Sequence, residues 1–184
     1  MEEDILIYLF LANGFEEVEA LTPLDYLRRC ELPVKTVAVE NRLVTGSHQI
    51  TVMADLLMSD LKPQETEMII LPGGMPGTLN LEKSQGVQEM IDHCAKQGKY
   101  IAAICAAPSI LGHKGLLNGK KATCYVGFED QLLGAEYTGE PVVQDGNIIT
   151  ARGAGTANQF AFRLAEILCG RERAETLKAG ILWE

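Results

Sequence analysis

The chain has 184 residues, of which 47% are hydrophobic and 22% are charged, and its formal net charge is −9. These values are typical of a single globular domain with an ordinary buried core. The acidic balance argues against nucleic-acid binding, because contacts to phosphates require clustered Lys and Arg. We therefore expect one domain over residues 1–184 and no nucleic-acid partner.

The predicted elements alternate between apolar strands and amphipathic helices. In chain order, strands are expected at residues 5–10, 34–39, 68–71, 100–104 and 147–150. Helices are expected at residues 16–30, 84–97, 108–116 and 156–168. Short antiparallel pairs are expected at 43–46 with 49–54 and across the turn at 145–147. Apolar strands separated by helices predict an α/β fold with a mostly parallel sheet and helices on both faces.

The distribution of cysteines and the N-terminal segment indicate the cellular compartment in which we expect the protein. The five cysteines are scattered without a C-x-x-C pair, and the three histidines are isolated from one another. This distribution favours reduced thiols in a cytoplasmic protein over a disulfide framework or a metal site. Residues 5–12 are too few to span a bilayer, and acidic residues precede them where a signal peptide carries positive charge. We expect a cytoplasmic protein with no membrane association.

In a parallel sheet the carboxyl ends of the strands meet at one rim, where ligands bind. After the first strand, Glu16, Glu17 and Glu19 fall in the first turns of the next helix. Carboxylates at the start of a helix are stabilised by the helix dipole, and this effect explains at least two of the three glutamates. The sequence does not select which glutamate points inwards.

Two glycine-bearing turns follow later strands. In residues 71–77, Gly73 and Gly74 allow backbone N–H groups to approach a ligand or a developing oxyanion closely, and no P-loop pattern is present. In residues 151–157, the glycines match only half of a dinucleotide-binding fingerprint. We expect Arg152 and these glycines to shape a pocket rim or simply to close the turn, and we expect no cofactor.

Cys105 ends a buried strand, and Pro108 opens the helix that follows. At such a strand-to-helix turn the helix dipole favours the thiolate, which is the form that attacks carbonyl carbons. Most buried cysteines are inert, but this position favours a nucleophile. The next residue is Ala106, so no adjacent histidine is available, and only His48 in the first hairpin stays open as a partner. A carboxylic acid is the preferred partner of the thiol.

Four motifs in order resemble the ThiJ/PfpI superfamily, closest to the branch of the parkinsonism-associated protein deglycase and its bacterial relatives. They are Gly14-Phe-Glu-Glu-Val-Glu19, Leu71-Pro-Gly-Gly74, Ala102-Ala-Ile-Cys-Ala-Ala-Pro108 and Arg152-Gly-Ala-Gly-Thr156, and they span nearly the whole chain. The resemblance implies a flavodoxin-like α/β sandwich that forms homodimers and needs no cofactor.

The resemblance also implies roles for individual residues. It places the nucleophile on Cys105, its protonated carboxylic partner on Glu19, and backbone amides of Gly74 and Ala106 around the reacting oxygen. The remaining pocket residues that we expect are Gly73, His48, Tyr125, Arg29 and Arg152.

Family activities include glutathione-independent conversion of methylglyoxal to lactate (a glyoxalase reaction), deglycation of early glycation adducts, and protection through cysteine sulfinate. Some members carry labels for thiamine (thiazole) biosynthesis. We expect a cysteine-dependent enzyme whose substrate is a small 2-oxoaldehyde or a glycated molecule. The alternative is a redox-sensing or chaperone-like protein that works by oxidation of Cys105. Amidotransferase-like or proteolytic chemistry is disfavoured, because Ala106 replaces a histidine of another branch and Tyr125 stands where relatives often place one.

Overall fold

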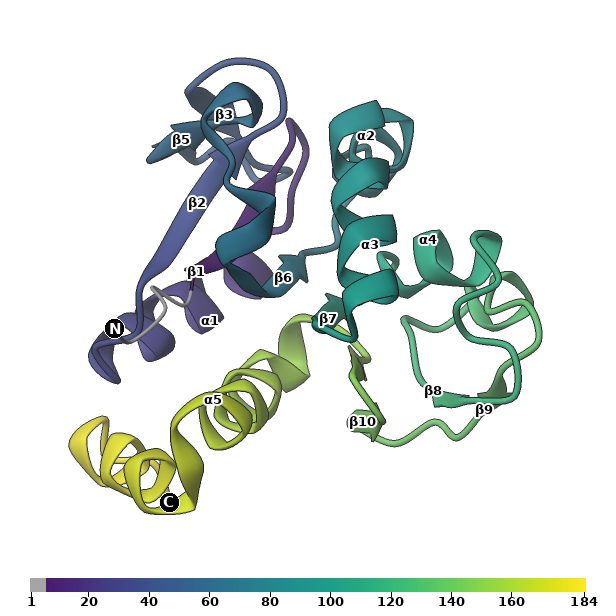
Figure 1. Cartoon of the computed structure of the whole chain (residues 1–184). Coiled ribbons are helices and arrows are strands. Elements are labelled where there is room, and N and C mark those ends of the chain that lie inside the picture. Colours follow the sequence, from purple (N-terminus) through teal and green to yellow (C-terminus); the bar gives the residue numbers. More distant parts are fainter. Residues whose placement is uncertain (1–5) are drawn as a thin grey trace.

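Five apolar segments build the centre of the computed structural model, which describes residues 6–184 (Figure 1). They are β1 (Leu6–Leu11), β2 (Val34–Ala38), β6 (Thr66–Leu71), β7 (Tyr100–Ile104) and β11 (Ile148–Ala151). Nearly all of their residues are buried on both faces, as expected of parallel strands covered by helices. The sheet order is β10-β11-β7-β6-β1-β2-β5, and only β10 (Val142–Asp145) runs antiparallel to its neighbour. The predicted α/β sandwich is confirmed.

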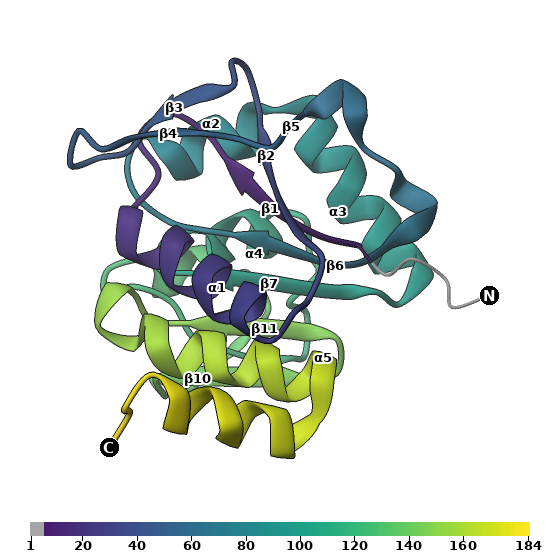
Figure 2. The same ribbon diagram turned by 90° about the vertical axis from the view of Figure 1, so that its left-hand side faces the viewer.

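The helices form two layers (Figure 2). Helices α1 (Glu17–Arg29) and α5 (Ala157–Gly180) cover one face, and α2 (Gly77–Lys83), α3 (Gln85–Gln97) and α4 (Pro108–His113) cover the other. Successive side chains of β1 point to opposite faces of the sheet. Leu9 therefore packs in the layer of α1 and α5, and Phe10 packs in the opposite layer. Both side chains are fully buried.

Several short elements lie outside the predicted set. They are β5 (Leu56–Leu57), β8 (Lys121–Ala122), β9 (Glu136–Tyr137), α2 and four 3-10 turns at Met58–Asp60, Pro63–Glu65, Glu129–Gln131 and Ala154–Thr156. The predicted hairpin forms as β3 (Leu43–Thr45) and β4 (Thr51–Met53). Helix α5 continues beyond the predicted end, with a break at Gly170. Residue 5, the expected start of the first strand, lies outside the described residues.

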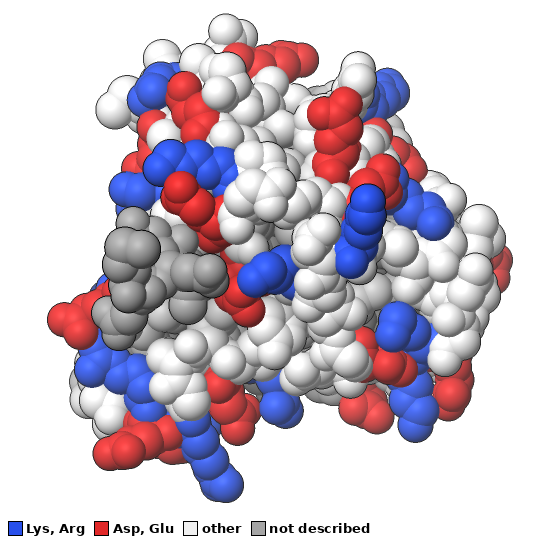
Figure 3. Space-filling view, viewed as in Figure 1, with Lys and Arg blue, Asp and Glu red and all other residues white. Residues whose placement is uncertain are grey.

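The surface carries both signs of charge. On the face shown in Figure 3, acidic and basic side chains are interspersed. Some are paired, as in the Arg28–Asp55 ion pair at 2.6 Å. Within residues 6–184, no helix combines the length and apolar character needed to cross a bilayer.

The strand order sets the position of the site. The chain leaves β1 for β2 on one side and reaches β6 and then β7 on the other, so the connections diverge between β1 and β6. In open α/β sheets, ligands bind at this divergence, beyond the carboxyl ends of the strands. The segments that follow β1, β6, β7 and β11 meet there.

Candidate active site

Cys105 follows the last residue of β7 and has a φ of +66°, a left-handed conformation that is uncommon for residues other than glycine. Its N–H donates to the carbonyl of Ala151 at 2.9 Å, and its own carbonyl accepts from the N–H of Tyr125 at 2.8 Å. These two bonds hold the turn from both sides. The strained backbone directs the thiol towards Glu19 instead of along the strand.

Glu19 is the carboxylic acid in contact with the thiol. It lies in the first turn of α1, is 1% exposed and forms a hydrogen bond with Cys105. Its Oε2 accepts from the N–H of Gly73 at 3.0 Å, and the N–H of Ala154 also donates to the carboxyl group. The carboxyl group therefore connects the turns after β6, β7 and β11. The amide of Ala154 was not predicted, although it lies between the two glycines of the 151–157 turn.

Glycine is required where the acid and the thiol meet. A Cβ atom on Gly73 would lie 2.6 Å from the Cβ of Cys105 and 2.6 Å from Oε2 of Glu19, closer than real Cβ contacts. Gly74 has a φ of +90°, which suits glycine. The N–H groups of Gly74 and Ala106 both bond to the sulfur of Cys105. The sulfur thus faces one carboxyl group and two backbone donors.

The ionisation of Glu19 and the ionisation of Cys105 affect each other. Burial raises the pKa of Glu19 to about 7, and the charge of Glu16 adds to this effect. Burial and then the charge of Glu19 raise the pKa of Cys105 to about 12. The expectation that position alone acidifies the thiol is wrong, because desolvation and an ionised Glu19 outweigh the backbone donors. When Glu19 is protonated its repulsion disappears, and the amides of Gly74 and Ala106 favour the thiolate.

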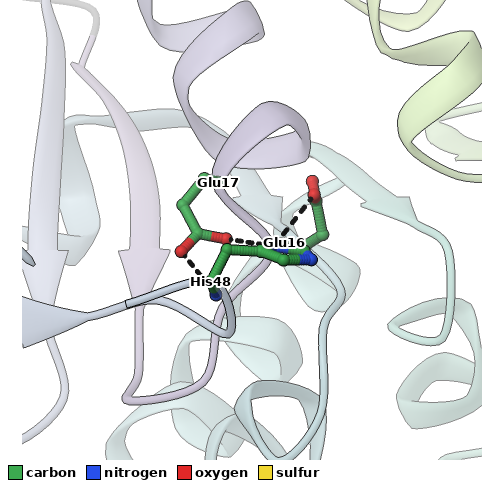
Figure 4. Close-up of side chains that lie close together, drawn as sticks. All are labelled: Glu16, Glu17 and His48. Atoms are coloured by element: carbon green, nitrogen blue, oxygen red, sulfur yellow. Dashed lines mark hydrogen bonds and ion pairs between the residues drawn. The ribbon is translucent and has the colours of Figure 1, made fainter. Parts of the chain in front are cut away.

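The other two glutamates, Glu16 and Glu17, form hydrogen bonds outside the contact between Glu19 and Cys105. Glu16 caps α1 by accepting from the N–H of Glu19 at 2.8 Å. Glu17 turns towards the β3–β4 hairpin, where it accepts from the N–H of His48 at 2.7 Å and lies 2.9 Å from its Nδ1 (Figure 4). Although burial opposes ionisation, the bonds from His48 lower the pKa of Glu17. The structure thus makes the choice that the sequence left open.

The same three side chains also resemble a ligand set for a metal ion. Ligand atoms of Glu16, Glu17 and His48 lie within 4.8 Å of one another. However, both carboxylate oxygens of Glu17 already bond groups of the hairpin, including the N–H of Ile50 at 3.4 Å and the hydroxyl of Ser47 at 3.3 Å. The cluster is accounted for as the anchor of the hairpin on α1.

The remaining predicted pocket residues divide into two groups. Tyr125 lies beside the site: a Cβ atom on Gly153 would be 3.2 Å from its ring and 3.6 Å from Oε1 of Glu19. Arg152 is exposed next to Gly153, and its N–H donates to Pro141 at 3.1 Å.

Arg29 does not belong to this pocket. It lies ten residues after Glu19 on α1, which is about 15 Å along the helix. There its side chain pairs with Asp25 at 2.7 Å. The expectation for Arg29 is wrong, because helix length separates the two ends of α1.

Comparisons with known proteins show the family to which the chain belongs. The chain matches the model of the DJ-1/PfpI family over residues 6–167. It is 40% identical over 167 residues to Protein DJ-1 homolog B of Arabidopsis thaliana, which is 89% of this chain and 38% of that protein. It is 35% identical over 151 residues to Deglycase PfpI of Pyrococcus furiosus, covering 80% of this chain and 90% of that protein.

A solved structure shows the same fold. Oxidized Toxoplasma gondii DJ-1 superposes with a TM-score of 0.92 at 35% identity, covering 97% of this chain and 98% of that chain. The chain spans less than half the length of the Arabidopsis relatives, 38% of one and 45% of the other.

We predict that Glu19→Gln changes how stability depends on pH. The folded-state pKa of Glu19 is about 7, raised from an ordinary value of 4.5. Its contribution to stability is therefore fully present below the unfolded-state pKa and is lost as the pH rises through 7. Glutamine does not ionise, so between pH 5 and pH 8 the free energy of unfolding should fall by up to about 3 kcal/mol less in the variant. Urea denaturation at both pH values measures this.

Glu175→Gln is the control for this measurement. Glu175 lies on α5, and Lys178 lowers the pKa of its carboxyl group, so neither group of this pair titrates between pH 5 and pH 8. An equal fall in wild type and Glu19→Gln would contradict the raised pKa of Glu19.

Proposed function

Because the chain belongs to the DJ-1/PfpI family, we propose that it is a cysteine-dependent enzyme that acts on reactive carbonyl groups. The substrates are free 2-oxoaldehydes such as methylglyoxal, early glycation adducts, or both. The observation that carries the proposal is the buried contact between Glu19 and Cys105, with two backbone donors at the sulfur. A relative of 35% identity is named a deglycase, which supports the reaction class.

The first step of the proposed reaction is addition to the aldehyde. The carboxylate of Glu19 takes the thiol proton of Cys105 as the sulfur bonds to the aldehyde carbon, and the carbonyl electron pair moves to oxygen. The N–H groups of Gly74 and Ala106 stabilise this oxygen as preorganised donors. Protonation of the oxygen by Glu19 gives a neutral hemithioacetal.

The second step moves a proton between carbons. The carboxylate of Glu19 removes the proton from the former aldehyde carbon and delivers it to the neighbouring carbon, while the hydroxyl proton on the first carbon passes to the oxygen on the second. The product is a thioester of lactate. Water hydrolyses it and releases the thiol, so methylglyoxal and one water give lactate. A carboxyl group with a pKa of about 7 suits both directions of transfer.

A second candidate function is redox sensing at the same thiol. Cys105 is only partly buried, so an oxidant can reach the sulfur. A protonated Glu19 and the two backbone donors are arranged to hydrogen-bond the oxygens of a sulfinate. The DJ-1 of Toxoplasma gondii has been solved in an oxidized state, which supports this candidate.

We also propose that the protein is a homodimer. Four apolar side chains on α1 and the β3–β4 hairpin are largely exposed: Val18 48%, Leu43 63%, Ile50 51% and Met53 74%. Leu43 and Met53 are register partners in this small separate sheet. Clustered exposed apolar side chains of this kind mark contact surfaces. A second copy of the chain is the partner that we propose for them.

A reducing compartment, the cytoplasm, fits the thiols. All five cysteines are free, and the proposed reaction requires Cys105 as a thiol. We retain this location as part of the proposal.

The first prediction concerns turnover of methylglyoxal in the absence of glutathione. Cys105→Ser should abolish activity, and Glu19→Gln should lower kcat by about 10²-fold or more, because general acid–base catalysis contributes on the order of 10²–10⁴. Lactate formation followed by steady-state assay measures both. Cys94→Ser, in the opposite helix layer, is the matched control. Wild-type turnover by Cys105→Ser would exclude the mechanism.

The second prediction concerns oxidation of Cys105. Mild peroxide should add two oxygens to the Cys105 peptide of the wild-type protein, as read by mass spectrometry. In Glu19→Ala the donor to the sulfinate is lost, so a third oxygen should be added more readily. A wild-type peptide that never gains two oxygens would rule out the sensor.

The third prediction concerns assembly. Met53→Lys places a charge in the exposed apolar cluster and should convert the dimer to a monomer, measured by light scattering after size exclusion. Leu182→Lys, at a position that is 88% exposed near the C-terminus, is the control and should leave the dimer intact. A wild-type monomer, or no change in mass for Met53→Lys, would contradict the proposed interface.

A further inference from the structure

Two thiols that the proposed reaction does not use lie in contact near the end of α1 that is remote from Cys105. Cys30 caps the C-terminus of α1, and Cys169 lies on α5 next to the break at Gly170. The two side chains are hydrogen-bonded to each other. Both pack in the layer between α1 and α5, which lie side by side in Figure 2.

We propose that Cys30 and Cys169 are a second oxidation site, at which a reversible disulfide joins α1 to α5. The oxidant is a peroxide. The sulfur of Cys169, the more exposed of the two, bonds one peroxide oxygen as the O–O bond breaks, which gives a sulfenic acid and water. The sulfur of Cys30 then bonds that of Cys169, and the S–O bond breaks with loss of a second water. In total, two thiols and one hydrogen peroxide give one disulfide and two waters.

The backbone at both cysteines is suited to closing this bond. A disulfide bond is about 2.05 Å long, shorter than a contact between two thiols, so α1 and α5 must approach slightly. Gly170 has a φ of 82° and a ψ of 165°, which interrupts α5 immediately after Cys169. Cys30 is itself a helix end, and Glu31 after it has a φ of 61°. Neither sulfur is held in the middle of an uninterrupted helix.

Charge and access also favour the site. Arg173 of α5 pairs with Glu31 at 2.6 Å, which ties the two helix ends together beside the thiols. Its guanidinium favours the anionic form of Cys30, although burial and Cys169 raise the pKa of Cys30 to about 11. Because Cys30 is buried and Cys169 is only partly buried, we assign the first attack to Cys169. A cavity of about 310 Å³ is lined in part by Cys30 and Arg173.

The remaining cysteines differ from this pair. Cys94 and Cys124 are fully buried in the opposite helix layer. Cys105 is partnered by a carboxyl group. Cys30 and Cys169 thus contact each other, whereas Cys105 contacts a carboxyl group. The proposed disulfide does not depend on the chemistry of Cys105.

The test uses the 184-residue chain carrying Cys105→Ser, treated with hydrogen peroxide. Mapping of unreduced peptides should recover a peptide in which Cys30 is linked to Cys169. The closed loop runs from residue 30 to residue 169, so Tm should rise by roughly 5 °C or more. Dithiothreitol should reverse both changes. Cys30→Ser and Cys169→Ser should each abolish the link, and Cys94→Ser should retain it.

Three results would overturn the proposal. One is the absence of the linked peptide at peroxide concentrations that oxidise Cys105 in the wild-type protein. Another is addition of oxygens to Cys169 while Cys30 stays free. The third is a linked peptide with no reversible change in Tm. Mapping of the wild-type protein gives the answer even where a variant fails to fold. A positive result with Cys105→Ser separates this site from the proposed enzyme.

Discussion

The contact between Glu19 and Cys105 is the constraint on which the surrounding structure depends. An ionisable carboxyl group that is 1% exposed is costly unless hydrogen bonds compensate for its burial. Gly73 and Ala154 supply these bonds from the turns after β6 and β11, and Cys105 supplies the partner from the turn after β7. The left-handed backbone of Cys105 is a further cost that the hydrogen bonds to Ala151 and Tyr125 offset.

The parallel sheet explains how residues so distant in the chain form one site. Four parallel strands, β1, β6, β7 and β11, end at the same edge of the sheet. The segment after each strand therefore places one backbone or side-chain group in the site. The buried strands make this placement rigid. The absence of a side chain at Gly73 lets the acid and the thiol approach each other across the rim.

Much of this could be predicted from sequence, and the failures have physical causes. Apolar strands and turn glycines identified the sheet and the position of Cys105, because burial and backbone strain are visible in residue types. Which glutamate faces the thiol depends on the orientation of α1 against the sheet, which three adjacent carboxylates cannot reveal. The acidity of Cys105 was misjudged, because desolvation and the charge of Glu19 arise only in the folded protein. The distance of Arg29 from the pocket follows from the length and direction of α1, which the residue pattern alone does not give.

The anchoring of the β3–β4 hairpin has a consequence for communication within the molecule. Glu17 holds the hairpin through His48, and Glu19, two residues later, is hydrogen-bonded to Cys105. The exposed apolar side chains of the hairpin and the acid of the site are therefore fastened to the same helical turn. The hydrogen bonds from the hairpin to Glu17 thus end on the turn that also carries Glu19. The first turn of α1 therefore fixes the position of both the exposed hairpin and the buried Glu19.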